Sequence, residues 1–298
     1  MDVANRTINR HNPDIPPSMY FGMTPEYERR YNKIYRSTLK LCGVKKFIAK
    51  KRNVYARDDS KLSITQEILD VAKIVDPKLD DISIDYLANR GVSLGIANKY
   101  RICSTSILTS LLPNDAVENL SLCIPRRFDD YIDDRSSDGI SVPYYFRGIF
   151  CGFLTRFIGS KSSFVKYAFT CPSRVLFGVD WNVDEVFVVE GLFDAIAMSE
   201  FGYNATALCD SQPCYFKLYW ISKFEKINLL FDNDYAGYLG ALKSYIALIN
   251  LFDIDDSRIN ILLLKGKDPS ELCEWDQISF NDLKNITERA RDEIENVV

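Results

Sequence analysis

From residue 184 onward, short apolar runs alternate with amphipathic stretches along the chain. Runs such as EVFVVE at 185–190 and INLLFD at 227–232 have the length and the β-branched content of buried strands. Each is followed by apolar residues at helical spacing, and Gly202 ends the first such stretch. Repeated strand–helix units predict a parallel sheet covered by helices. We also expect strands at 205–210 and 259–265, and helices at 192–202, 214–224, 236–252 and 281–298.

The preceding part of the chain has a different pattern. Residues 64–75 and 84–102 carry apolar residues at helical spacing, with Gly91 as a helix end and Ser93 as the N-cap of the next helix. Aromatic and β-branched residues then dominate, which predicts short antiparallel strands. These strands are expected within 141–159, 162–170 and 173–179.

The two patterns divide the chain into three parts within a mixed α/β fold class. We expect a basic arm or helical segment at 1–60, a lobe of helices and then short strands at 61–180, and a parallel-sheet domain with a C-terminal helix at 181–298. The 298 residues, 47% of them hydrophobic, suffice for a proper core. No run is long enough for a membrane helix and no signal peptide is visible, so we expect a cytoplasmic protein without a membrane partner.

The net charge of −4 conceals a basic segment near the N-terminus. Residues 26–57 are rich in lysine and arginine, opposed only by Glu26 and Glu28, and tyrosine and phenylalanine are interleaved with them. Phosphates and unstacked bases require that combination, although a solvated amphipathic helix explains it equally well. The eight cysteines form no Cys-x-x-Cys pair and His11 is the single histidine, so no zinc site is expected.

Carboxylates follow three of the predicted parallel strands. Glu190 and Asp194 follow the first, Asp232 and Asp234 follow the third, and Asp268 follows the fourth. Ligands gather at the carboxyl ends of parallel strands, so these groups should meet at one edge of the sheet. Period-two geometry would put the third-strand pair on one side. Hard oxygen ligands suit magnesium, with manganese as the alternative ion.

Each of these acidic groups also has an ordinary interpretation when taken alone. A Glu-Gly-x-x-Asp segment occurs as a solvated helix start, which the helix dipole favours. An Asp-x-Asp segment occurs in ordinary loops, so either motif by itself is a weak signal. All three groups, in order and each at a strand end, favour a metal site.

At these residues the chain resembles a known family. Glu190-Gly191-x-x-Asp194, Asp232-x-Asp234-x-Ala236-Gly237 and Lys267-Asp268-Pro269 are similar to the three signatures of a TOPRIM domain. More narrowly, they resemble DnaG-type DNA primases of bacteria and phages. The likeness extends over roughly residues 80–275, including YLANRG at 86–91 and the strand-rich lobe.

The resemblance implies a function. It implies synthesis of short RNA primers from ribonucleoside triphosphates on single-stranded DNA, by magnesium-dependent nucleotidyl transfer. The catalytic residues would be Glu190, Asp194, Asp232, Asp234 and Asp268; Glu190, Asp232, Asp234 and Asp268 would hold the metal, and Asp194 would complete its shell. Glu190 would ligate the metal or accept the proton of the attacking hydroxyl. The residues implied to bind nucleotide or template are Arg156, Lys166 and Arg174, with Lys265 and Lys267 as weaker candidates.

The chain departs from the family pattern in two places. The zinc-binding module that usually precedes the core has no counterpart, and the basic segment 26–57 stands there instead. Many relatives have an acidic residue at the position of Ser270, for which Glu271 is the available substitute.

Partners and alternatives follow from the same resemblance. No phosphate-binding Gly-x-x-x-x-Gly-Lys-Ser/Thr loop occurs, so we expect a separate replicative helicase, with a tailed phage as the source and the host bacterial cytoplasm as the compartment. A TOPRIM nuclease and a non-catalytic nucleic-acid-binding accessory subunit remain as alternatives.

Overall fold

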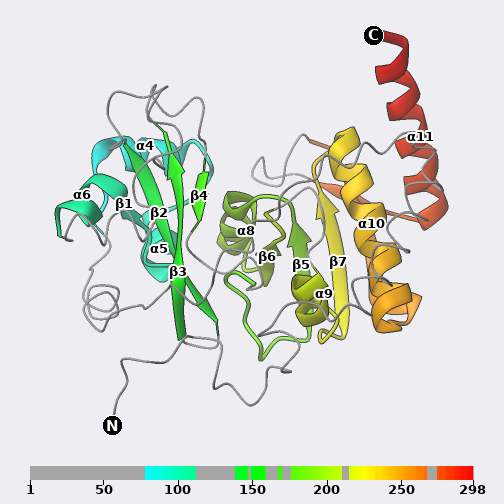
Figure 1. Ribbon diagram of the computed structural model, residues 1–298, viewed down its shortest axis with the longest axis horizontal. Coiled ribbons are helices and arrows are strands. Elements are labelled where there is room, and N and C mark those ends of the chain that lie inside the picture. Colours follow the sequence, from blue (N-terminus) through cyan, green and yellow to red (C-terminus); the bar gives the residue numbers. More distant parts are fainter. Residues whose placement is uncertain are drawn as a thin grey trace, which may run out of the picture. The chain divides into compact units, whose positions relative to one another are not determined.

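The computed structural model describes residues 78–111, 138–146, 149–158, 167–169, 176–209, 215–266 and 274–297 (Figure 1). These residues belong to two compact units, one within 78–169 and one that starts at Leu176. The basic segment 26–57 and the predicted helix 64–75 lie outside the described residues. No helix in the described part of the chain is both long and apolar enough to cross a membrane.

The first unit is an antiparallel sheet with three short helices. Its strands lie in the order β1-β2-β3-β4, and every neighbouring pair is antiparallel. The prediction of short antiparallel strands in this region is therefore confirmed for three strands. The elements are α4 (Asp81–Ala88), α5 (Leu94–Lys99), β1 (Cys103–Ser104), α6 (Thr105–Ser110), β2 (Gly139–Phe146), β3 (Ile149–Phe157) and β4 (Tyr167–Phe169).

The helix boundaries in this unit follow the residues predicted to form them. Gly91 adopts a left-handed conformation with φ 67°, and the next amide, that of Val92, donates to the Leu87 carbonyl oxygen at 2.9 Å. This pattern closes the C-terminus of α4. The Ser93 hydroxyl oxygen accepts from the Ile96 amide at 3.2 Å and caps α5. Both predicted boundaries are confirmed.

The strand predicted within residues 173–179 is wrong for its described part. Phe177 and Gly178 form a bend, and Gly178 has φ 66°, in the left-handed region rather than the strand region. Leu176 and Phe177 are nevertheless buried. The apolar run is therefore a buried connection, and hydrophobicity alone does not distinguish it from a short strand.

The second unit contains the predicted parallel sheet. Its order is β6-β5-β7-β8-β9, and β6, β5, β7 and β8 are mutually parallel. The fifth strand, β9, pairs antiparallel with β8 and was not predicted. It lies at the edge, so its side chains are only partly buried and it lacks an apolar run. The strands are β5 (Glu185–Val189), β6 (Ala205–Ala207), β7 (Lys226–Phe231), β8 (Ile259–Leu264) and β9 (Trp275–Ile278).

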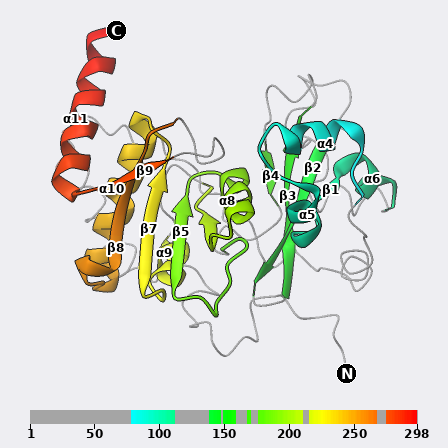
Figure 2. The same ribbon diagram turned by 180° about the vertical axis from the view of Figure 1, so that it is seen from behind.

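The helices of this unit occur where the apolar periodicity placed them, except the short η5, which was not predicted. They are α8 (Leu192–Met198), η4 (Ser199–Phe201), α9 (Tyr215–Ile221), α10 (Tyr235–Phe252), η5 (Asp256–Arg258) and α11 (Phe280–Val297). Helices α9 and α10 lie on the same face of the sheet, in front of it in Figure 1 and behind it in Figure 2. The ring of Phe280 on α11 stacks on that of Tyr245 on α10, with centroids 4.8 Å apart.

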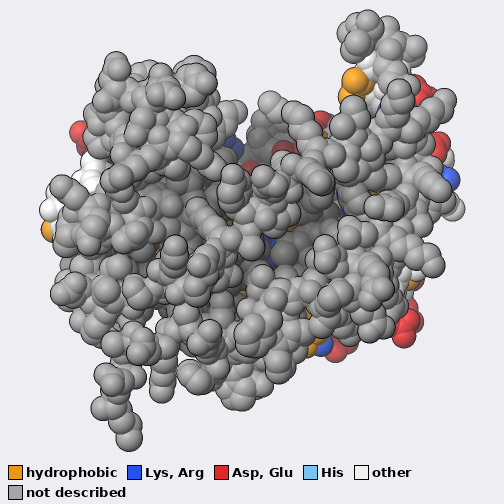
Figure 3. Space-filling view, in the orientation of Figure 1, with side chains coloured by type: hydrophobic (Ala, Val, Ile, Leu, Met, Phe, Trp, Pro, Cys, Tyr) orange, Lys and Arg blue, Asp and Glu red, His pale blue; other side chains and the backbone are white. Residues whose placement is uncertain are grey.

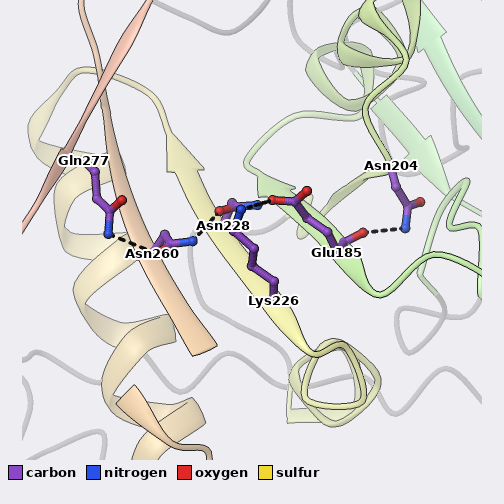
Figure 4. Close-up of polar contacts among 6 residues, drawn as sticks. All are labelled: Glu185, Asn204, Lys226, Asn228, Asn260 and Gln277. Carbon is purple, nitrogen blue, oxygen red and sulfur yellow. Dashed lines mark hydrogen bonds and ion pairs between the residues drawn. The ribbon is translucent and has the colours of Figure 1, made fainter. Parts of the chain in front are cut away.

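A row of polar side chains crosses the sheet and fixes its register (Figure 4). Asn228 on β7 donates to the Glu185 carboxylate at 2.7 Å and accepts from Asn260 on β8 at 2.8 Å. Gln277 on β9 donates to Asn260 at 3.0 Å. Asn228 is 3% exposed, so a one-residue slip would leave buried polar groups without partners.

Candidate active site at the carboxyl edge of the sheet

Acidic residues follow β5 and β7, which are neighbouring parallel strands. Glu190 comes directly after β5, and Asp232 comes directly after β7. Asp268, expected after β8, lies outside the described residues, as does Glu271. The carboxyl edge of the sheet therefore carries the first two acidic groups of the predicted site.

Glu190 is half-buried and has a strongly perturbed carboxyl group. Its pKa is raised from 4.5 to about 7, first by burial and then by the negative charges of Asp234 and Asp194. Three of the predicted acidic residues are therefore within electrostatic reach of one another. A group with this pKa exchanges protons near neutral pH, as a general acid–base residue requires.

Asp194 lies in the first turn of α8 and is 7% exposed. Its Oδ2 atom accepts a hydrogen bond of 3.1 Å from the Gly191 amide, which joins the end of the loop to the helix start. A β-carbon at Gly191 would lie 2.3 Å from that oxygen, so no other residue fits without displacing the carboxylate. One oxygen of Asp194 thus has a structural role.

The segment after β7 is a tight turn rather than an extended continuation of the strand. The strand ends at Phe231, and the Asp234 amide donates to the Asp232 carbonyl oxygen at 2.9 Å. The expected period-two geometry does not apply to this pair, because alternation holds only while the backbone stays extended. Asp232 is half-buried and Asp234 is exposed, and Asn233 accepts a hydrogen bond from the Tyr238 hydroxyl.

Asp234 also begins α10. Its Oδ1 atom accepts from the Gly237 amide at 2.8 Å, so it is the N-cap of this 18-residue helix. A β-carbon at Gly237 would lie 2.1 Å from the Asp232 carbonyl oxygen. The glycine therefore lets the first turn of α10 pack against the backbone of the acidic turn.

The donor chemistry of these residues fits a divalent cation. Within the described ranges no three His, Cys, Asp or Glu side chains are close enough to form a metal site by themselves. Asp268, the remaining predicted ligand, is not among those residues. Besides burial, the charges of Asp234 and Asp194 raise the pKa of Glu190, and a bound cation would offset that repulsion.

The predicted basic residues have different surroundings. Arg156 lies on β3 of the first unit, where its Nε atom donates to the Tyr86 hydroxyl at 3.2 Å. Lys265 follows β8, and its ammonium group is 3.2 Å from Asp276 and 3.4 Å from Glu274. These two carboxylates raise the pKa of Lys265. Lys166, Arg174 and Lys267 lie outside the described residues.

The opposite end of α10 carries exposed acidic residues. Asp253, Asp255 and Asp256 follow the helix C-terminus, and acidic side chains are visible at the surface on this side of the second unit (Figure 3). The negative charges of these carboxylates repel the phosphates of a nucleic acid. A polyanionic ligand would therefore be repelled from this end of the helix.

Two residues near the site had no role in the sequence-based prediction. A β-carbon at Gly240 on α10 would lie 3.2 Å from the ring of Phe231 and 3.6 Å from Oε1 of Glu190, so this glycine allows α10 to pack closely on the Phe231 ring beside the carboxylate. Lys217 on α9 is 5% exposed. Its sequence signal is a single lysine within the otherwise apolar and aromatic segment YFKLYWI.

Comparison with known proteins gives one sequence relative and two solved structures of particular relevance. The chain is 29% identical over 207 residues to the DNA primase of Legionella pneumophila, a match that covers 62% of this chain and 36% of that protein. A structure of the DnaG catalytic core aligns with TM-score 0.50 and 21% identity, over 70% of this chain and 73% of that one. The Aquifex aeolicus primase, solved with its zinc-binding and RNA polymerase domains, aligns with TM-score 0.50 and 19% identity, over 94% of this chain and 65% of that one.

The sequence match and the structural matches are to the same class of protein. No protein-family model matches the sequence. The chain spans just over a third of the length of the Legionella primase, so the match concerns part of that protein. The structural matches show that the fold is that of a primase catalytic core. Sequence and fold together identify this chain as a homologue of DnaG-type DNA primases.

Proposed function

We propose that this chain is the catalytic core of a DNA primase, which joins ribonucleoside triphosphates into short RNA primers on a single-stranded DNA template. One observation carries the proposal: Glu190 is half-buried at the carboxyl edge of the sheet within electrostatic reach of Asp234 and Asp194, and burial together with these two charges raises its pKa to about 7. Structural acidic residues seldom gather in this way, because unneutralised carboxylates destabilise one another.

Each side chain has a role in this proposal. Glu190, Asp232, Asp234 and Asp268 hold magnesium, which supplies neutralisation of phosphate charge when bound. Glu190 alternatively accepts the proton of the attacking 3′-hydroxyl in place of ligating the metal. Asp194 holds the loop before α8 through the Gly191 amide. Arg156, Lys166 and Arg174, with Lys265 and Lys267 as weaker candidates, bind the phosphates of nucleotide or template.

The test uses the full chain with single-stranded DNA, labelled ribonucleotides and magnesium. We expect short oligoribonucleotides from the unsubstituted protein and none from Asp232→Asn, which keeps the size of the side chain but removes its charge. Asp253→Asn is the matched control, because Asp253 is exposed at the far end of α10 and asparagine tolerates its left-handed conformation. The same assay is repeated in a parallel series with manganese in place of magnesium.

The products also distinguish the alternatives. Cleavage of the template without synthesis would indicate a nuclease that uses the same acidic residues. Binding of DNA with neither product, over templates of varied sequence, would indicate an accessory subunit. A separate helicase partner is part of the proposal and would appear as stimulation of primer synthesis when a replicative helicase is added.

A further inference from the structure

Lys217 is a buried cation that the proposed reaction does not use. It lies on α9, is 5% exposed, and directs its ammonium group at the end of β6. The group donates to the Leu208 carbonyl oxygen at 2.5 Å and to the Ala207 carbonyl oxygen at 3.4 Å. A lysine is costly to bury, so its retention among apolar neighbours calls for a specific role.

The peptide unit between Leu208 and Cys209 is held on both sides. Its carbonyl oxygen accepts from Lys217, and its amide donates to the Glu190 carbonyl oxygen at 2.9 Å. Because a peptide unit is planar, the two hydrogen bonds together fix its orientation. The amide side of this unit holds the backbone of Glu190 in place.

The backbone at Cys209 is in a conformation that opposes this arrangement. Cys209 has φ 51°, in the left-handed region that residues other than glycine rarely adopt. Rotation of the 208–209 peptide by half a turn would bring that angle to a negative value, out of the left-handed region. The same rotation would withdraw the Cys209 amide from Glu190 and the Leu208 carbonyl from Lys217.

We propose that Lys217 is a positioning residue, which prevents the 208–209 peptide from flipping and so holds the backbone of Glu190 at the carboxyl edge of the sheet. Without its ammonium group the Leu208 carbonyl would be buried beside an apolar side chain, and the flip would relieve both that loss and the strain at Cys209. The effect of Lys217 on cation binding rests on the proposed function of Glu190. Its effect on the orientation of the 208–209 peptide is independent of that function.

The test measures amide hydrogen exchange at Cys209 in the full chain without divalent ions. We expect Lys217→Met to speed exchange of this amide about tenfold, since an unsatisfied buried carbonyl shifts the flip equilibrium by that order. Lys217→Arg, which keeps donors, should retain most of the protection. The matched control Lys223→Met removes an exposed lysine just after α9 and should leave the amide unchanged.

A second substitution separates positioning from general packing. Cys209→Gly removes the strain, because glycine adopts positive φ freely. In the Lys217→Met background it should restore protection of the residue 209 amide and binding of Mn²⁺, the probe ion, to within threefold of Cys209→Gly alone. A packing defect at Lys217 would not be repaired by a glycine at 209.

The outcomes decide the proposal. Unchanged exchange at Cys209 in folded Lys217→Met would overturn it, and so would failure of Cys209→Gly to restore protection. If Lys217→Met does not fold, the double variant is expected to fold, and its failure to do so would also count against the proposal. Absence of Mn²⁺ binding in the unsubstituted chain, with the exchange pattern as expected, would contradict the metal site of the proposed function and leave the positioning role standing.

Discussion

Oδ1 of Asp234 accepts a hydrogen bond of 2.8 Å from the Gly237 amide, while the charge of the same carboxylate raises the pKa of Glu190. One side chain is thus both the cap of α10 and a member of the acidic site. The two roles require different properties, since the cap needs an oxygen acceptor and the site needs a negative charge.

Asp234→Asn should separate these two roles. Asparagine caps a helix as well as aspartate, so the melting temperature should stay close to that of the unsubstituted protein, whereas Asp234→Ala should lose about 1 kcal/mol of unfolding free energy. Both variants should lose primer synthesis. Thermal melts and the primer assay, run side by side, check this. Equal destabilisation by both variants would show that the cap contributes nothing.

Glu190→Gln should raise stability in a pH-dependent way in the absence of divalent ions. The folded-state pKa of Glu190, about 7, lies above its ordinary value of 4.5, so the folded protein binds this proton more tightly than the unfolded chain. Stability of the unsubstituted protein should therefore fall as pH rises from about 4.5 to about 7, and glutamine removes that loss.

Melting temperatures measured in chelator between pH 5 and pH 8 check this prediction. The advantage of Glu190→Gln should be small near pH 5 and reach its full size near pH 8. An advantage that is constant over the range would mean that Glu190 titrates normally. Added Mg²⁺ should reduce the advantage at pH 8, because a cation neutralises the carboxylates.

Gly237→Ala should be strongly destabilising, although alanine normally favours helices. Its β-carbon would meet the Asp232 carbonyl oxygen at 2.1 Å, so α10 or the acidic turn must shift. We expect a loss of about 1–3 kcal/mol, the usual range for overpacking. Denaturant unfolding checks it. Gly95→Ala is the control, since there the β-carbon meets only the Ser93 hydroxyl at 3.4 Å, an ordinary contact.

Arg156→Ala should weaken binding of single-stranded DNA and reduce its salt dependence. Loss of one phosphate contact lowers the slope of log K against log salt by about 0.7 for single strands. Fluorescence anisotropy over a range of salt concentrations measures this slope. Tyr86→Phe, which removes only the hydroxyl that accepts from Arg156, should cause a smaller loss without a change of slope. An unchanged slope in Arg156→Ala would remove this residue from the phosphate-binding set.

The sequence alone determined the strand–helix order of the second unit and the acidic residues that follow its strands. Apolar runs such as 227–231 and the helical spacing in 236–252 are local patterns, and secondary structure follows them when each element buries its apolar side. The glycine at 91 and the cap at Ser93 are local signals of the same kind.

Only the tertiary structure decided how these residues act on one another. The pKa of Glu190 depends on its burial and on charges that other elements supply, and the turn at Asp232–Asp234 depends on how closely α10 approaches through Gly237. The contact of Lys217 with the end of β6 joins two elements, and the edge strand β9 forms because β8 offers it a partner. Such relationships join residues that are distant in sequence, and no local periodicity encodes the distances between them.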